Sequence, residues 1–388
     1  MANQFISPEG DLENIFVSNY EMIDQYSQLG TLWLWGSNTY SQFGDNTFTD
    51  RSSPVQTVAA GTNWRLVGNG SYHTMAIKTD GTLWLWGRND NGGLGDNSRT
   101  RRSSPVQTVA AGTNWRLVAG GWYHSGAIKT DGTLWTWGLG TSGQLGDNTS
   151  ASKSSPVQTV SGGTNWKLLS AGSDHTMAIK TDGTLWNWGD NASGQLGDNS
   201  TTRRSSPVQT VSGGTNWKSV DGNHYYTAGI KTDGTLWLWG SNSYGQLGDN
   251  STTSRSSPVQ TAAAGTNWKS VACGLRATAA IKTNGQLWTW GLGSDGSLGN
   301  NAITHRSSPV QTAAGGTNWK SVGAGHLSMA AIKTDGTLWA WGYNGAGQNG
   351  DNSTTKRSSP VQTVSGGTNW RSVSCGFYFT AANKHTRF

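Results

Sequence analysis

The sequence predicts an all-β protein with the fold of a seven-bladed β-propeller, and three observations lead to this fold class. A unit of 51 residues recurs seven times between positions 30 and 386. Of the 22 tryptophans, 21 occupy three fixed positions of that unit, and only Trp122 falls outside them. The 55 glycines and the recurring Ser-Ser-Pro segments, interpreted as turns, favour many short strands. A fixed period of this length indicates a solenoid, a propeller or another repeat array.

The repeats define the expected domain organisation. We expect an N-terminal extension over residues 1–29, one closed propeller over 30–386 and a tail of residues 387–388. A single unit is too small to bury a core alone, which argues for one closed body rather than several domains. The predicted blades span 30–80, 81–131, 132–182, 183–233, 234–284, 285–335 and 336–386.

The extension differs from the rest of the chain. It carries five acidic residues and no Lys or Arg, whereas the whole chain has a net charge of +6. Its apolar residues recur every three or four positions, which predicts a short amphipathic helix after Ser7-Pro8. We expect this helix to dock on a partner protein or on the propeller itself. The predicted docking residues are Leu12, Ile15, Phe16, Tyr20 and Ile23.

Four strands are predicted in each unit. In the second copy they cover Thr82–Trp86, Pro105–Val109, Trp115–Val118 and His124–Thr130, and Asp131-Gly132 provides a two-residue turn into the next copy. Four antiparallel strands repeated seven times indicate a propeller, in which ring closure removes exposed sheet edges. The sequence does not decide how the ring closes, because residues 22–28 and 378–384 are both candidates for the same strand position.

Several other features limit the possible functions. The equivalent cysteines Cys273 and Cys375 stand two units apart, so we expect both to be free thiols. No apolar run approaches 18 residues, which argues against insertion into a membrane. The N-terminus lacks the features of a signal peptide. Regularly spaced cations are typical of solvated surface, so specific binding of nucleic acid is not expected.

Comparison of the copies separates two faces of the predicted propeller. With four alternating strands, the first and third turns of a unit lie on one face and the other two turns on the opposite face. The latter are nearly constant, as in Thr79-Asp80-Gly81, whereas the former vary and are rich in aromatic residues. Relaxed constraint on surface loops is one explanation, and recognition is the other. The predicted binding residues are Tyr72, Trp122, Tyr123, His224, Tyr225, Arg276, Phe377 and Tyr378.

The sequence contains no recognisable catalytic, cofactor or metal motif, so we expect a non-enzymatic protein. His73, His124 and His175 occupy one repeat position, which favours hydrogen-bonded core histidines over ligands or bases. The aspartate series that begins with Asp45 follows a glycine and precedes an asparagine. A turn that bonds its own backbone explains this series, and calcium ligation is the alternative.

Residues 30–386 resemble a known repeat family. The pattern Gly-x-Leu-Trp-x-Trp-Gly-x-Asn-x-x-Gly-Gln-Leu-Gly-Asp-Asn of residues 234–250 is followed by Ser-Ser-Pro-Val-Gln-Thr, and residues 172–179 supply Gly-x-x-His-Thr-x-Ala-Ile. This order resembles the regulator of chromosome condensation repeat. The resemblance implies the seven-bladed fold strongly and a function weakly, since family members include exchange factors, inhibitors and a photoreceptor.

Three functions are compatible with this resemblance. Residues 1–14 also resemble the start of propeller proteins of marine bacteriophages, which implies a tail or fibre protein that presents the variable face to a host-surface glycan or protein. If this resemblance holds, the protein is expected in the virion; otherwise it is expected in the cytoplasm.

The alternatives are nucleotide exchange with chromatin binding and ultraviolet sensing. Exchange lacks support because no unit contains an insertion and the extension is acidic. For ultraviolet sensing, Gly121-Trp122-Tyr123-His124-Ser125 resembles the photoreceptor motif once, with Tyr123 in place of arginine.

Overall fold

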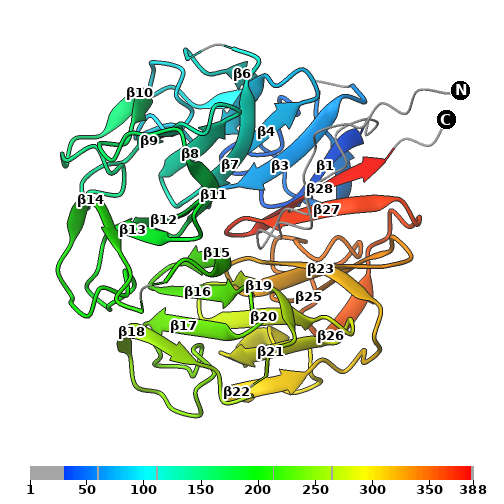
Figure 1. Cartoon of the computed structure of the whole chain (residues 1–388). Helices are drawn as coiled ribbons and strands as arrows, with labels where there is room; N and C mark the ends of the chain where they lie inside the picture. Colours follow the sequence, from blue (N-terminus) through cyan, green and yellow to red (C-terminus); the bar gives the residue numbers. More distant parts are fainter. Residues whose placement is uncertain (1–29, 59–60, 111, 213, 264, 386–388) are drawn as a thin grey trace, which may run out of the picture.

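A computed structural model describes residues 30–58, 61–110, 112–212, 214–263 and 265–385. The predicted N-terminal helix and its docking residues lie outside these ranges. Seven four-stranded antiparallel sheets form a ring, with outer strands such as β6, β14, β18 and β22 at the perimeter (Figure 1). The predicted all-β, seven-bladed fold is therefore confirmed.

Each sheet contains one strand of each of four kinds. The innermost strands are β3 (Trp64–Asn69), β7 (Trp115–Gly120), β11 (Trp166–Ala171), β15 (Trp217–Asn223), β19 (Trp268–Cys273), β23 (Trp319–Ala324) and β27 (Trp370–Cys375). The second strands are β4 (His73–Lys78), β8 (His124–Lys129), β12 (His175–Lys180), β16 (Tyr226–Lys231), β20 (Ala277–Lys282), β24 (Ser328–Lys333) and β28 (Phe379–His385).

The third strands carry the Leu-Trp-x-Trp segment, and the fourth strands form the outer edge. The third strands are β1 (Gly30–Gly36), β5 (Leu83–Gly87), β9 (Leu134–Gly138), β13 (Leu185–Gly189), β17 (Leu236–Gly240), β21 (Leu287–Gly291) and β25 (Leu338–Gly342). The fourth strands are β2 (Arg51–Gln56), β6 (Arg102–Gln107), β10 (Lys153–Gln158), β14 (Arg204–Gln209), β18 (Arg255–Gln260), β22 (Arg306–Gln311) and β26 (Arg357–Gln362). A short 3-10 helix η1 (Ser294–Gly296) lies between β21 and β22.

The sheets are offset from the sequence units by half a repeat. A sheet such as β3-β4-β5-β6 joins the last two strands of one unit to the first two of the next. The blades therefore do not coincide with units such as 30–80. The reason is that the tight Asp-Gly turn pairs a second strand with the Leu-Trp-x-Trp strand that follows it. The Asp131-Gly132 turn is an example, in which the Asp131 carboxylate accepts the backbone N–H of Thr133 at 2.9 Å.

This offset also determines how the ring closes. The last sheet has the order β2-β1-β28-β27, so it contains strands from both ends of the described chain. β1 pairs with β28 from Gly30↔His385 to Gly36↔Phe379. The position that residues 22–28 and 378–384 could both have filled thus belongs to residues 379–385. Hydrogen bonds of one sheet hold the two ends of the propeller together.

The Ser-Ser-Pro segments are strands rather than the turns that the sequence suggested. Ser103, Ser104 and Pro105 lie inside β6, which starts three residues before the predicted strand. Proline lacks a backbone N–H, but an outer-edge strand tolerates this loss because its outward side has no ladder partner. A register irregularity between Leu85 and Gly87 accompanies the segment.

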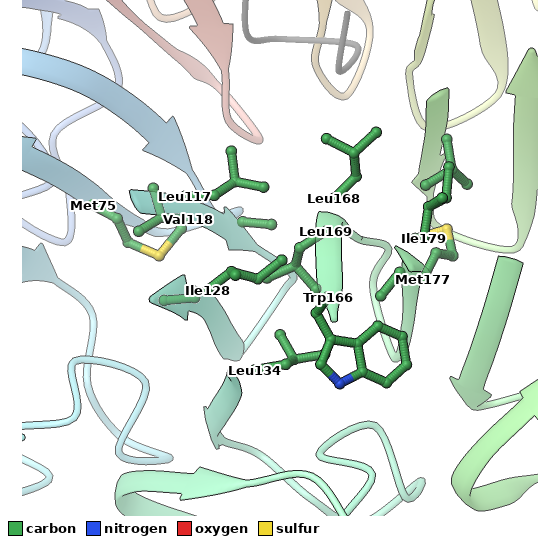
Figure 2. Close-up of a cluster of buried hydrophobic side chains, with 14 of the residues drawn as sticks. Met75, Leu117, Val118, Ile128, Leu134, Trp166, Leu168, Leu169, Met177 and Ile179 are labelled. Atoms are coloured by element: carbon green, nitrogen blue, oxygen red, sulfur yellow. The ribbon is translucent and has the colours of Figure 1, made fainter. Parts of the chain in front are cut away.

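Tryptophans and aliphatic residues fill the spaces between neighbouring sheets. Figure 2 shows part of one such cluster, which includes Val118 and Ile128 of one sheet and Leu169 of the next. The second tryptophan of each Leu-Trp-x-Trp segment also ties its sheet to the preceding one. Trp137 is fully buried, and its Nε1 donates to the carbonyl oxygen of Gly93 at 2.8 Å. The second tryptophan of the segment therefore contributes both packing and a hydrogen bond between neighbouring sheets.

Two other expectations concern the described residues. Cys273 and Cys375 are free thiols, as predicted from their separation. No helix in the ranges that the structure describes is long and apolar enough to cross a membrane.

Candidate functional site

The variable turns gather at one end of the central channel. The turns that follow the innermost strands surround a small hollow, which is lined by residues that include Asn69, Gly121, Trp122, His326 and Phe377. The long loops between the third and fourth strands lie on the same side, since the ring of Tyr40 in one of them is 5.1 Å from that of Tyr72. The predicted division into a variable and a constant face matches this arrangement.

Four rings from different blades meet across the hollow, and we call them the aromatic mouth: Trp122, His224, His326 and Phe377. The centroid of the Trp122 ring lies 4.8 Å from that of His224 and 6.0 Å from that of Phe377. Phe377 in turn lies 3.9 Å from His326. These residues occupy the same turn position in four blades, while Ser71, Ser173 and Leu275 occupy it in the others. The large rings of four blades can therefore span the channel.

A group of tyrosines around an arginine continues the aromatic surface. The ring centroids of Tyr72 and Tyr123 are 5.8 Å apart and nearly parallel. The Arg88 guanidinium lies 4.7 Å from the Tyr40 ring, 5.4 Å from the Tyr72 ring and 4.9 Å from the Tyr123 ring. Its Nε also bonds Asp90 at 2.6 Å. Cation-π contacts and this ion pair hold the arginine among the three tyrosines.

Two further predicted residues extend the aromatic mouth outward. Tyr225 is 38% exposed, and its ring centroid lies 3.6 Å from that of His224. Tyr378 lies 5.1 Å from His326 and 5.6 Å from Tyr343. Both hydroxyl-bearing rings combine an apolar body with a polar tip, a combination that is enriched in interfaces.

Arg276 stands apart from these rings. Its guanidinium lies 4.8 Å from the Tyr244 ring and donates to the Tyr244 hydroxyl at 3.0 Å. The ring of Tyr244 also contacts that of His305. The structure thus connects seven of the eight predicted binding residues through ring contacts, and Arg276 belongs to a neighbouring group on the same face.

The sequence prediction omitted several residues of this surface. Tyr40, Arg88 and Tyr343 come from the loops between third and fourth strands, and His326 comes from the same turn position as Trp122. The variation of these positions among the seven copies was the sequence signal that could have identified them. The contact of His326 with Phe377 joins adjacent blades, and such distances do not follow from variation alone.

The aromatic mouth is uncharged at neutral pH. Burial, with smaller contributions from Arg276 and His326, lowers the pKa of His224 to about 4. Burial and the nearby Arg276 likewise lower the pKa of His326 to about 4. Beside the mouth, burial and then the charge of Asp190 raise the pKa of Asp174 to about 6. Neutral imidazoles let the rings pack closely without electrostatic repulsion.

The histidines below the mouth have the structural role predicted for them. His73, His124 and His175 are buried, and each Nε2 lies 2.8 to 3.1 Å from a hydroxyl of the next blade. For His124 that hydroxyl belongs to Thr176 at 2.9 Å. They therefore join neighbouring blades through hydrogen bonds.

The aspartate series forms the turns predicted for it. Asp96 Oδ1 accepts the backbone N–H of Ser98 at 3.1 Å and its hydroxyl at 2.7 Å, and Oδ2 pairs with Arg102. Within the described ranges, no group of three His, Cys, Asp or Glu side chains is arranged to hold a metal ion.

Comparison with known proteins agrees with the repeat pattern. The model of the regulator of chromosome condensation (RCC1) repeat matches residues 29–77, 80–128, 131–179, 182–230, 233–281, 284–332 and 335–382. The chain is 31% identical over 325 residues to the ultraviolet-B receptor UVR8 of Arabidopsis thaliana, which covers 82% of this chain and 74% of the receptor.

Two crystal structures share the fold. Human WBSCR16 has a TM-score of 0.80 at 20% identity, over 92% of this chain and 100% of that chain. Prp20p from Saccharomyces cerevisiae, described with its binding to Gsp1p and histones, has a TM-score of 0.80 at 19% identity, over 93% of this chain and 92% of that chain. The seven matched repeats and the seven observed blades together show that this chain belongs to the RCC1 repeat family.

Proposed function

We propose that the chain is a non-enzymatic binding protein that holds a partner protein on its aromatic mouth and the adjoining tyrosines. One observation supports this proposal above all others, namely the contact of divergent turns from separate blades in one aromatic surface. Trp122, for example, contacts the rings of both His224 and Phe377. The constant turns on the opposite face show no such divergence.

Structural constraint accounts for the constant turns and so sharpens the contrast. Gly132 has a φ of 79°, and a Cβ on this residue would lie 2.0 Å from the carbonyl oxygen of Thr164. Substitution there would strain the backbone and collide with a neighbouring loop. The positions of Trp122 and Tyr225 carry no comparable restriction, since other units have Ser, Leu or Asp there. Large aromatic residues at such positions favour recognition, because Tyr and Trp are enriched in interfaces.

The chemistry of this surface suggests the kind of partner. Its neutral rings offer apolar contact, while the Tyr225 hydroxyl and the Arg88 guanidinium supply hydrogen-bond donors. A protein segment that presents apolar or aromatic side chains with nearby carbonyl groups would complement both. Hot spots of protein interfaces have this composition.

Site-specific photo-crosslinking tests the proposal. A photoreactive phenylalanine at Tyr225 or Tyr378 should capture the same protein in cells, whereas Val160, which is 52% exposed, provides a control position on an outer loop. The purified partner should then bind the unmodified chain and bind the Trp122→Ala variant at least about 30-fold more weakly, as for a hot-spot residue. Equal capture from Val160, or unchanged affinity of a folded Trp122→Ala variant, would contradict the proposal.

The docking role of residues 1–29 remains a prediction within this proposal. The segment would provide a second attachment for the partner through Leu12, Ile15 and Phe16. Replacing these three residues by Asp should weaken the complex without changing the thermal unfolding of the propeller. Unchanged affinity would exclude the segment from the interface.

The prediction of a phage tail or fibre protein gains no support from the relatives described above. A plant photoreceptor and a yeast protein that binds Gsp1p and histones fit the two alternatives better. Binding of the purified chain to bacterial cells and to a glycan panel would test the host-surface hypothesis. Retained binding after Trp122→Ala would show that any such contact uses another surface.

Ultraviolet sensing is a second candidate, supported by one specific observation. Trp122, the tryptophan outside the repeat positions, lies in the aromatic mouth, and the chain is 31% identical to the ultraviolet-B receptor. Illumination should then change the oligomeric state in size-exclusion chromatography, and Trp122→Phe should abolish the change. An identical elution profile with and without ultraviolet-B light would exclude this function.

Nucleotide exchange is the remaining alternative. The seven units have equal length, so no blade carries an inserted wedge. A nucleotide-release assay with purified small GTPases would test it directly.

That the protein has no catalytic activity also remains a prediction. It is supported by the lack of a catalytic motif in the sequence.

A further inference from the structure

Two arginines contact one tyrosine ring beside the aromatic mouth. The Arg101 guanidinium lies 4.8 Å from the centroid of the Tyr40 ring, and the Arg88 guanidinium lies 4.7 Å from the same centroid. Arg101 Nη1 also donates to the backbone carbonyl oxygen of Thr39 at 3.2 Å. The rings of two further tyrosines contact Arg88. We call these five residues the arginine–tyrosine cluster: Arg88, Arg101, Tyr40, Tyr72 and Tyr123.

Arg101 differs from the cations at its repeat position in other units. Arg203 occupies this position two units later and pairs with Asp190 at 2.8 Å. Lys356 occupies it in the last unit and forms an ion pair with Asp295 of the preceding blade. Arg101 forms no ion pair with any residue that the structure describes. Its charge is therefore held by a ring contact and a carbonyl group alone.

The reason for this difference lies at the position that Tyr40 occupies. Asp295 stands at the same repeat position, from which its carboxylate reaches the lysine of the following blade. In the loop of Tyr40 a phenol ring replaces that carboxylate, so Arg101 of the following blade contacts the ring. Asp50 of this loop accepts the backbone N–H of Asn38 at 2.7 Å instead.

Arg88 is only partly neutralised. Its Nε donates to Asp90 Oδ2 at 2.6 Å, and its Nη1 lies 3.4 Å from the Tyr123 hydroxyl. Among the described residues, no oxygen accepts a hydrogen bond from its Nη2. Two guanidinium groups and one carboxylate leave a net charge of +1 in and beside the cluster. A small hollow lies next to these groups, and its lining includes Arg88, Asp90, Tyr123 and Trp122.

The cluster is continuous with the aromatic mouth. The ring centroid of Tyr72 lies 5.3 Å from that of Phe377, and the ring centroid of Tyr123 lies 6.3 Å from that of Trp122. In an extended segment, side chains two positions apart lie on one side and are separated by about 7 Å. One short segment of a partner can therefore contact the mouth and the cluster with neighbouring side chains.

Resting on the proposed binding function, we propose that the arginine–tyrosine cluster binds an Asp or Glu carboxylate of the partner, beside the apolar side chain that the mouth holds. A carboxylate matches the fork of N–H donors that a guanidinium presents. One carboxylate would balance the net charge of the cluster. A phosphate group, with nearly two negative charges, would exceed that charge and would be repelled by Asp90.

Selection of short random peptides displayed on yeast, with the full chain as bait, tests the proposal. We expect selected peptides to combine an apolar residue with Asp or Glu about two positions away, and to lose binding to the Trp122→Ala variant. Peptides that require Trp122 but share no acidic residue would overturn this inference and leave the proposed function standing. Failure to select any peptide that requires Trp122 would overturn both.

A thermodynamic cycle then locates the acidic residue of a selected peptide. Calorimetry would compare the peptide and its Glu→Gln or Asp→Asn form on the original chain and on the folded Arg101→Gln variant. Each single change should weaken binding about fivefold, and the two together should weaken it little further, because both remove the same contact. Fully additive effects would place the carboxylate elsewhere and would overturn the proposal.

A third peptide separates the two kinds of anion. Phosphoserine at the acidic position should bind no more tightly than Glu, since Asp90 shares the hollow. Tighter binding of the phosphopeptide would overturn the choice of a carboxylate.

The chain itself supplies a substitution that restores the missing acid. Tyr40→Asp reproduces the arrangement of Asp295 and should pair with Arg101, so it should compete with the carboxylate of the peptide. Tyr40→Asn removes the ring without adding charge and is the matched control. We expect the Asp variant to bind the peptide at least about threefold more weakly than the Asn variant. Equal affinities would overturn the proposed charge pairing.

A gain of affinity tests the site independently of any loss. Asp90→Asn removes the acid that competes for Arg88 and should strengthen peptide binding about threefold. Arg306→Gln removes an exposed cation at the start of β22 and should change binding by less than about twofold. Equal weakening by Arg306→Gln and Arg101→Gln would show a response to net charge alone, and unchanged or weaker binding of Asp90→Asn would contradict the carboxylate site.

Discussion

The indole of Trp122 and the imidazole of His224 lie 4.8 Å apart between ring centroids, although a complete blade separates the turns that carry them. The intervening turn has Ser173 at the equivalent position, which leaves room for the contact. Large and small residues thus alternate around this part of the channel.

This contact predicts opposite effects of two tryptophan substitutions on binding and stability. Trp122 is partly exposed, so Trp122→Ala should lower the free energy of unfolding by about 1 kcal/mol or less while it abolishes most partner binding. Trp137 is buried, and Trp137→Ala should cost about 3–5 kcal/mol. Chemical denaturation of both variants checks this. Similar losses of stability would show that Trp122 is a core residue.

Acid should destabilise the propeller through its buried histidines. Burial lowers the pKa of His73 to about 4 and that of His175 to about 4. An unfolded histidine has a pKa near 6.5, so the unfolded chain binds more protons between these values. Stability is then complete above about pH 6.5 and falls as pH drops toward 4, by at most about 3 kcal/mol per histidine. Denaturation at several pH values measures this slope.

The chain offers a matched control for that titration. Tyr226 occupies the repeat position of these histidines, and its hydroxyl lies 3.1 Å from that of Thr278. Because His175 bonds the equivalent Thr227, His175→Tyr should preserve the inter-blade bond and reduce the acid sensitivity. An unchanged pH slope in this folded variant would assign the sensitivity to other groups.

A turn aspartate should contribute measurably through its ion pair. Asp249 pairs with Arg255 at 3.0 Å, whereas Asn300 occupies the same position in the unit that carries Arg306. Asp249→Asn should therefore fold normally and lose about 1 kcal/mol, because the arginine of the pair is partly exposed. The reverse change, Asn300→Asp, should raise stability by a similar amount. Thermal unfolding of both variants compares them, and a loss in both would contradict the role of the pair.

Ring closure predicts a strong effect of a small truncation. Removing residues 379–388 eliminates β28, which lies between β1 and β27 in the closing sheet. We expect loss of the cooperative unfolding transition, since both neighbouring strands would lose their ladder partners. Circular dichroism during heating measures the transition. A cooperative transition near the original midpoint would show that the other six sheets are sufficient.

Sequence patterns predicted the elements that depend on local chemistry. The Asp131-Gly132 turn and the Leu-Trp-x-Trp strands follow from turn preference and alternation, and the structure confirms them. The sequence places Pro105 at the start of its strand, whereas the residue lies in the interior of β6. The sequence does not reveal this position, because an edge strand tolerates proline according to which of its sides has no neighbouring strand. The offset of the sheets depends on pairing between consecutive units, which the repeat boundaries do not reveal.

The candidate site was predictable to the extent that it depends on variation between copies. Trp122 and Phe377 differ from their counterparts and lie together in the aromatic mouth. Arg88 also varies, but its position among three tyrosines depends on the curvature of loops from two blades.

The closing sheet has a consequence for synthesis on the ribosome. β1 is among the first described strands to emerge, and its partner β28 is the last. Until β28 is synthesised, β1 therefore lacks the ladder partner that it has in the folded propeller, and a second nascent chain or a chaperone could occupy this edge. Completion of the ring is limited by the arrival of residues 379–385, so a pause or early stop near this point would leave an almost complete propeller open to pairing between molecules.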